Sequence, residues 1–126
     1  MRRLSVLCAL GLTLAAAACD NSPKAPDEAG VCYEAILLPG NKIRYNKVAE
    51  NQPNIENCAA RLENMRLKFL ALGGNRSEIM GAYQGQFIFV QLEGVFVGQT
   101  LTSIRYPALV RTGDGRLAIP GAMPQK

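Results

Sequence analysis

The stretch QFIFVQLEGVFVGQ, residues 86–99, decides the fold of this chain. Its residues alternate with a period of two on both sides of Glu93-Gly94, which predicts a β-hairpin with a two-residue turn. The pairing that this turn implies sets Gly98 opposite Phe89, where the missing side chain leaves room for the ring. Both faces of the hairpin are apolar, so a single helix covers only one of them. One face carries Phe87, Phe89 and Phe96, and the other carries Ile88, Val90, Val95 and Val97.

The segments around this hairpin predict one helix and further strands. Between Asn54 and Gly73-Gly74, apolar side chains recur every three or four residues for about five turns, which is typical of one apolar helix face. Strands are predicted at 31–38, 42–49, 104–111 and 116–119. The fold class is therefore α+β, with an antiparallel sheet of four to six strands packed on one long helix and one disulfide. A helix followed by a four-stranded meander resembles the cystatin-type arrangement.

Residues 1–18 resemble a secretory signal peptide. Met1-Arg2-Arg3 is a positive start, followed by an apolar run to Ala18. As a helix this run extends about 22 Å, short of the roughly 30 Å hydrocarbon core of a bilayer. The segment is thus typical of an export signal rather than of a transmembrane span.

The small residues just before Cys19 resemble the lipobox of bacterial lipoproteins. That resemblance implies that Cys19 is acylated, with palmitate among its chains, and becomes the N-terminus of a membrane-anchored protein. The alternative is an ordinary signal-peptidase site with a chance cysteine after it. Residues 19–30 are polar and contain two prolines, so we expect the lipidated cysteine to be followed by a disordered tether. Residues 31–126 then form a single α+β domain.

The cysteines predict one disulfide. Cys8 leaves with the signal and Cys19 receives the lipid, so Cys32 and Cys58 remain as a pair in an oxidising compartment. Their bond would clamp the first strand onto the helix. A metal site is the alternative, and it lacks further ligands because the chain has no histidine.

Arg66 is a charge on the buried side of the helix. A helical wheel places it within the apolar stripe, on the side that faces the first strand. We predict a partly buried pair between Glu34 and Arg66, since Glu34 shares strand parity with Cys32. The alternatives are that Arg66 extends to solvent or pairs with Glu63, three residues before it.

Composition argues against catalysis. Without histidine, neither a Ser–His nor a Cys–His pair can form, and no carboxylates stand in a recognisable motif. We therefore expect no enzyme activity, no cofactor and no metal. When Arg2 and Arg3 leave with the signal, 12 basic and 10 acidic residues remain, a balance that does not predict nucleic-acid binding.

One concentration of basic residues, Arg105, Arg111 and Arg116, is a candidate contact for an anion or a partner. Arg105 and Arg111 share strand parity, and a four-residue turn would set Arg116 opposite Arg111. Like charges facing across a hairpin are unfavourable unless an anion lies between them. The alternative is that these residues protect a sheet edge, with Asp114 screening them.

A second candidate surface is aromatic. Tyr83 lies between glycines and could be an exposed anchor for a partner, or the ring of a turn folded onto the sheet. The sheet face that the helix leaves uncovered adds Phe87, Phe89 and Phe96 as candidate partner-facing side chains.

Residues 53–63 (PNIENCAARLE) and 81–89 (GAYQGQFIF) resemble small uncharacterised proteobacterial envelope proteins. That resemblance implies the compartment and brings no activity or site residues. We expect a membrane-anchored lipoprotein that faces the periplasm and binds or scaffolds an envelope protein. The alternatives are a soluble periplasmic protein-binding or inhibitor domain, and an enzyme that uses carboxylates and arginines.

Overall fold

The computed structural model describes residues 22–74 and 78–121, so the signal segment and Cys19 lie outside the described residues. Within these ranges the fold is α+β, with one helix and one sheet in which all neighbouring strands are antiparallel. The strand order is β2-β1-β3-β4-β5-β6-β7. The elements are β1 Cys32–Leu38, β2 Lys42–Ala49, α1 Ile55–Ala71, β3 Ile79–Tyr83, β4 Gln86–Gln91, β5 Gly94–Gly98, β6 Tyr106–Arg111 and β7 Leu117–Ala118.

The sheet has seven strands, more than the four to six predicted. The additional strand is β3, in the segment where the glycines on either side of Tyr83, Gly81 and Gly85, suggested a turn. A side chain at Gly81 would come within 2.2 Å of Leu62 Cδ1 and 2.7 Å of Tyr33 O, so glycine is needed for the close approach of α1 and β1. The turn lies just beyond, at Gln84-Gly85, and both residues have the positive φ that a tight two-residue hairpin requires.

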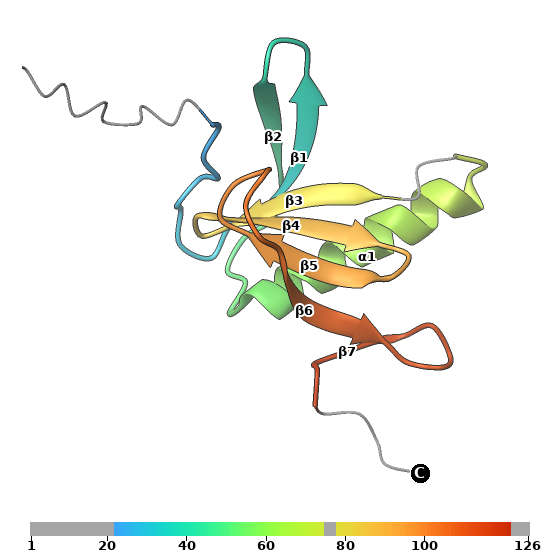
Figure 1. The fold of residues 1–126 in the computed structure, drawn as a ribbon. Coiled ribbons are helices and arrows are strands. Elements are labelled where there is room, and N and C mark those ends of the chain that lie inside the picture. The colour runs from blue at the N-terminus through green and yellow to red at the C-terminus, as the bar shows by residue number, and fades with distance from the viewer. Residues whose placement is uncertain (1–21, 75–77, 122–126) are drawn as a thin grey trace, which may run out of the picture.

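Helix α1 forms where the sequence predicts it and covers one face of the sheet (Figure 1). The Asn54 side chain accepts a hydrogen bond from the backbone N–H of Asn57 at 2.9 Å, which caps the N-terminus. After the helix, Gly73 adopts a φ of 87° and turns the chain away. The final turns run past the end of the strands, and Leu67 and Leu72 there are exposed. Within the described ranges, no helix is long and apolar enough to cross a bilayer.

The predicted disulfide joins Cys32 of β1 to Cys58 of α1, and both cysteines are fully buried. It closes a loop with a sequence separation of 26 residues. On the chain-entropy model, a loop of that length stabilises a small domain by about 3–4 kcal/mol. The bond therefore fixes the helix against β1, the strand next to the edge strand β2.

The two apolar faces of the β4–β5 hairpin form as predicted. Ile88, Val90 and Val95 pack with α1 in one core cluster, and Phe87 and Phe89 belong to another. The turn is one residue earlier than expected, at Leu92-Glu93, because Gln91 pairs with Gly94. Gly98 thus lies opposite Phe87 rather than Phe89. Because the pairing shifts by two residues, each side chain stays on its predicted face.

Residues 22–30 differ from the disordered tether that their composition predicts. Ala25 is buried in the cluster of Phe87 and Phe89. The Pro26 carbonyl accepts a hydrogen bond from the Gly85 N–H at 2.9 Å, and the Lys24 carbonyl accepts one from the Tyr45 hydroxyl at 3.2 Å. The apolar face left open by α1 thus binds this segment of the same chain.

Candidate functional site

A groove of about 610 Å³ lies between α1 and the β6–β7 hairpin. Its apolar lining includes Leu67 of the helix, Leu92 of the β4–β5 turn and Leu117 of β7, and its charged lining includes Glu63, Arg66 and Arg111. The exposed residues Asp114 and Arg116 lie at its rim. The groove thus combines leucine side chains with a cluster of charges that is largely removed from water.

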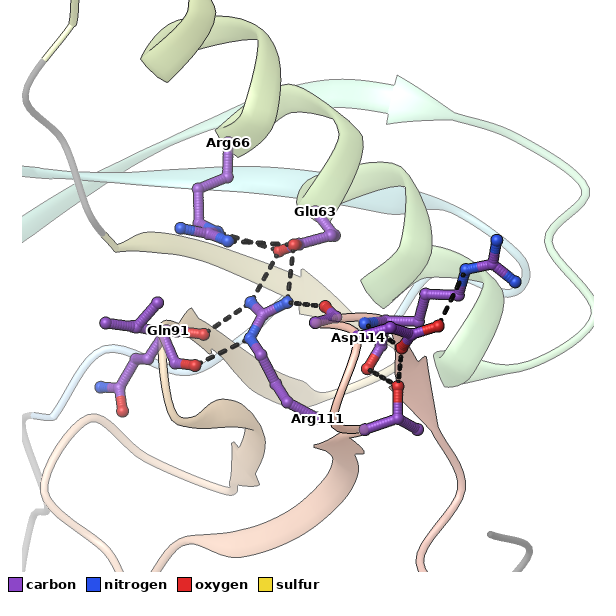
Figure 2. Close-up of polar contacts among 9 residues, drawn as sticks. Glu63, Arg66, Gln91, Arg111 and Asp114 are labelled. Atoms are coloured by element: carbon purple, nitrogen blue, oxygen red, sulfur yellow. Dashed lines mark hydrogen bonds and ion pairs between the residues drawn. The ribbon is translucent and has the colours of Figure 1, made fainter. Parts of the chain in front are cut away.

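Arg111 joins three parts of the fold beneath the groove (Figure 2). Its Nε donates to Leu92 O at 2.8 Å, and its Nη2 donates to Gln91 O at 2.8 Å. Nη1 donates to Gly115 O at 3.1 Å, and both Nη atoms donate to the Glu63 carboxylate at 2.8 and 3.1 Å. A guanidinium has five N–H groups, so every donor of Arg111 is used.

Glu63 lies between two guanidiniums. Arg66, one helical turn later, donates from Nε at 2.9 Å and from Nη2 at 3.0 Å, and Arg111 approaches from the sheet. Burial alone would raise the pKa of Glu63, but the hydrogen bonds and positive charges of both arginines outweigh it and lower this pKa. Glu63 therefore stays ionised and accepts four hydrogen bonds (Figure 2).

The predicted pair of Glu34 with Arg66 is wrong. Arg66 is buried, as the helical wheel indicates, but it pairs with Glu63. Glu34 instead accepts a hydrogen bond from Asn46 Nδ2 of β2 at 3.2 Å. The physical reason is that the i−3 partner on the same helix needs no match between strand and helix direction.

The three arginines of the predicted anion contact do not converge. A bulge in β6 is the reason: Val95 pairs with Leu109 while Phe96 pairs with Pro107, so β6 carries one extra residue. The bulge reverses the alternation between Arg105 and Arg111, and they point to opposite faces of the sheet.

On its face, the Arg105 guanidinium lies 3.5 Å from the centroid of the Phe89 ring. Arg116 remains exposed and pairs with Asp114 at 3.5 Å, which agrees with the screening role considered for Asp114. Of the three, Arg111 and Arg116 line the groove.

The candidate partner-facing aromatics are covered by their own chain. Tyr83 is buried and its hydroxyl donates to Gln52 O at 2.7 Å, which corresponds to the ring folded onto the sheet. Phe87 and Phe89 are fully buried, and Phe96 is half-buried against the same cluster. These rings therefore stabilise the fold and do not form an open surface.

Glu63 and Arg111, which meet across 48 residues of sequence, are the pair that sequence reasoning missed. The available signal was Glu63, a second charge beside Arg66 near the apolar stripe of the helix. Within residues 22–74 and 78–121, no three metal-ligating side chains come together. Comparison with family models, with curated proteins and with solved structures finds no match to this chain.

Proposed function

We propose that this protein is an exported binding module of the cell envelope, anchored to the membrane through Cys19 and facing the periplasm. Its partner is a protein that docks in the groove between α1 and the β6–β7 hairpin. The observation that carries the proposal is the cluster of Glu63, Arg66 and Arg111 in that groove, where two largely buried guanidiniums share one carboxylate.

The exposed leucines of the groove support a protein partner. Leu67 is 49% exposed and Leu92 is 68% exposed, although each lies beside buried charged groups. Apolar side chains next to fixed arginines are typical of the anchoring region of a protein–protein interface. A partner that covered them would remove apolar surface from water and exclude water from the charges.

The state of Glu63 supports binding over catalysis. A general base needs a free lone pair and a pKa near the working pH. Glu63 has a lowered pKa, and all its hydrogen-bonding positions are occupied by Arg66 and Arg111. The carboxylate holds two arginines in place and is a poor proton acceptor.

Two features favour export and anchoring. The sequence before Cys19 resembles a lipobox, and the Cys32–Cys58 disulfide is compatible with an oxidising compartment. The intact mass of the protein from the membrane fraction, measured without reduction, tests both. We expect a chain that begins at Cys19 and carries acyl groups; an unacylated chain in the soluble fraction would favour the soluble periplasmic alternative.

Site-specific photo-crosslinking tests the groove. The full chain carries a benzophenone amino acid at Leu67 or Leu92, and the matched control carries it at Leu37, a leucine of similar exposure on the β1–β2 hairpin. We expect both groove positions to capture the same protein, identified by mass spectrometry, and Leu37 not to capture it. Equal capture from Leu37, or no capture from either groove position, would refute the groove as the binding site.

A further inference from the structure

We infer that the groove recognises a carboxylate through the free edge of the Arg66 guanidinium, and that its occupant is an acidic peptide segment of the partner protein. This inference rests on the proposed function, because it names the chemistry of the partner at the same groove. It follows from a difference between the two buried arginines: all five N–H groups of Arg111 donate hydrogen bonds, whereas some of those of Arg66 do not.

Arg66 keeps one edge of its guanidinium free. Glu63 occupies the edge formed by Nε and Nη2, and no acceptor within the described ranges meets Nη1 or the second N–H of Nη2. No fully buried side-chain N or O of these residues lacks a partner, so the free Nη1 must reach open space. Because Arg66 lines the groove, that open space is the groove.

Arg111 cannot take this role. Its five N–H groups are all engaged: three donate to backbone carbonyls of the β4–β5 and β6–β7 turns, and two donate to the Glu63 carboxylate. An arriving anion would have to break these bonds. Arg111 therefore fixes Glu63, Glu63 fixes Arg66, and Arg66 presents its remaining edge.

The cluster of Glu63, Arg66 and Arg111 carries a net positive charge, which a bound anion would neutralise. Glu63 neutralises one of two guanidiniums, which leaves an excess positive charge on side chains that are 6% and 14% exposed. Asp114 and Arg116 at the rim balance one another. The free edge of a guanidinium matches the two oxygens of a carboxylate, in the bidentate geometry typical of arginine.

The leucines of the groove favour a peptide as the source of this carboxylate. A free phosphate or a lipid headgroup would satisfy Arg66 but leave Leu67 and Leu92 in water. A segment with a Glu or Asp beside an apolar residue would satisfy the charge and cover both leucines. A groove of about 610 Å³ has room for a few side chains of that kind.

The test compares two peptide libraries on the full-chain protein. One holds hexapeptides with Leu-Glu at their centre, and the other holds the matched Leu-Gln peptides. We expect the tightest Leu-Glu peptides to bind at least tenfold better than their Leu-Gln partners. Arg66→Gln and Arg66→Lys should each weaken that binding about ten- to a hundredfold, because lysine keeps the charge but lacks the planar edge.

Arg61→Gln is the matched control, since it removes an exposed arginine of the same helix that is not among the residues lining the groove. It should change the affinity less than threefold. A loss with Arg61→Gln as large as with Arg66→Gln would overturn the assignment to Arg66. Should Arg66→Gln fail to fold, the side-chain NMR signals of the unmodified protein decide instead: a Leu-Glu peptide must shift the Arg66 Nε–H signal and leave that of Arg105 unchanged.

The remaining outcomes separate this inference from the proposed function. Equal binding of Leu-Glu and Leu-Gln peptides would leave the groove as a binding site and overturn carboxylate recognition. Competition by inorganic phosphate at concentrations that match the peptide would overturn the peptide as ligand. Absence of any peptide binding, with crosslinking from Leu67 and Leu92 intact, would overturn the inference alone.

Discussion

On one face of the sheet Ile88 and Val90 are fully buried beneath α1, and on the other Phe87 and Phe89 are fully buried beneath residues 22–30 and the loop after β5. The helix is joined to the sheet by a disulfide and by a cluster of buried ion pairs. The cover over the phenylalanines is held by several hydrogen bonds and by the Arg105 guanidinium stacked on Phe89. The two faces are thus equally buried, but the helix is attached to the sheet more firmly than residues 22–30 are. The helix side is also the side that presents fixed charges in the groove.

Removing the charge of Glu63 should cause the largest loss of stability, and it tests the attachment of the helix. Glu63→Gln leaves two largely buried guanidiniums without their carboxylate, and breaking such a pair from one side costs about 3–5 kcal/mol. We expect a loss of that size in urea unfolding monitored by circular dichroism. Glu93→Gln, at an exposed turn, is the control and should change stability by less than about 0.5 kcal/mol. A small loss with Glu63→Gln would mean that the cluster does not hold the helix.

The disulfide is the second test of the helix face. Replacing Cys32 and Cys58 with alanine should cost about 3–4 kcal/mol through the greater freedom of the unfolded chain. Hydrogen exchange should then speed up in α1 and β1 more than in residues 22–30. An equal increase in exchange rate in α1, β1 and residues 22–30 would contradict the idea that the disulfide stabilises mainly the helix face.

Acid should weaken the helix face selectively. Because the pKa of Glu63 lies below its ordinary value of 4.5 in the folded protein, its contribution is complete above that pH and is lost as the pH falls through the lowered pKa. Unfolding free energies measured from pH 6 downward should decline more steeply in the unmodified protein than in Glu63→Gln. Parallel pH profiles of the two proteins would show that Glu63 is not the group responsible.

The smallest effect is expected on the phenylalanine face. Arg105→Ala removes a cation–π contact at an exposed position, worth about 0.5–1 kcal/mol. Arg105→Lys should restore part of it, which a purely steric role would not predict. A loss as large as that of Glu63→Gln would show that this cover is as firmly held as the helix.

The sequence predicted local patterns and missed what depends on one irregular residue. Alternation assigned Phe89 and Val90 to opposite faces, and elimination paired Cys32 with Cys58, because both inferences use regular periods or simple counts. The bulge in β6 breaks such a period, so the positions of Arg105 and Arg111 could not be read from strand parity. For the same reason the contact of Glu63 with Arg111 was not predicted.

Two further differences come from context rather than local preference. Gly81 looked like a turn residue, yet it lies inside β3 because Leu62 of α1 packs where a side chain would be. The segment around Ala25 is polar enough to be disordered alone, but the open phenylalanine face gives it something to pack against. Tertiary contacts outweighed local composition in both places.

The packed N-terminal segment changes how freely the domain would move. A tether of eleven disordered residues has a root-mean-square reach of roughly 18 Å. If Cys19 carries the lipid, only residues 20 and 21 separate it from Ser22, where the described chain begins, and three residue steps span at most about 11 Å. The segment packs on the phenylalanine face and is bonded to Tyr45 of β2 and to the β3–β4 turn, whereas the groove lies between α1 and the β6–β7 hairpin (Figure 1). An anchor that short would keep residues 22–30 close to the bilayer, so the domain would meet partners near the membrane surface rather than across the roughly 18 Å that a disordered tether allows.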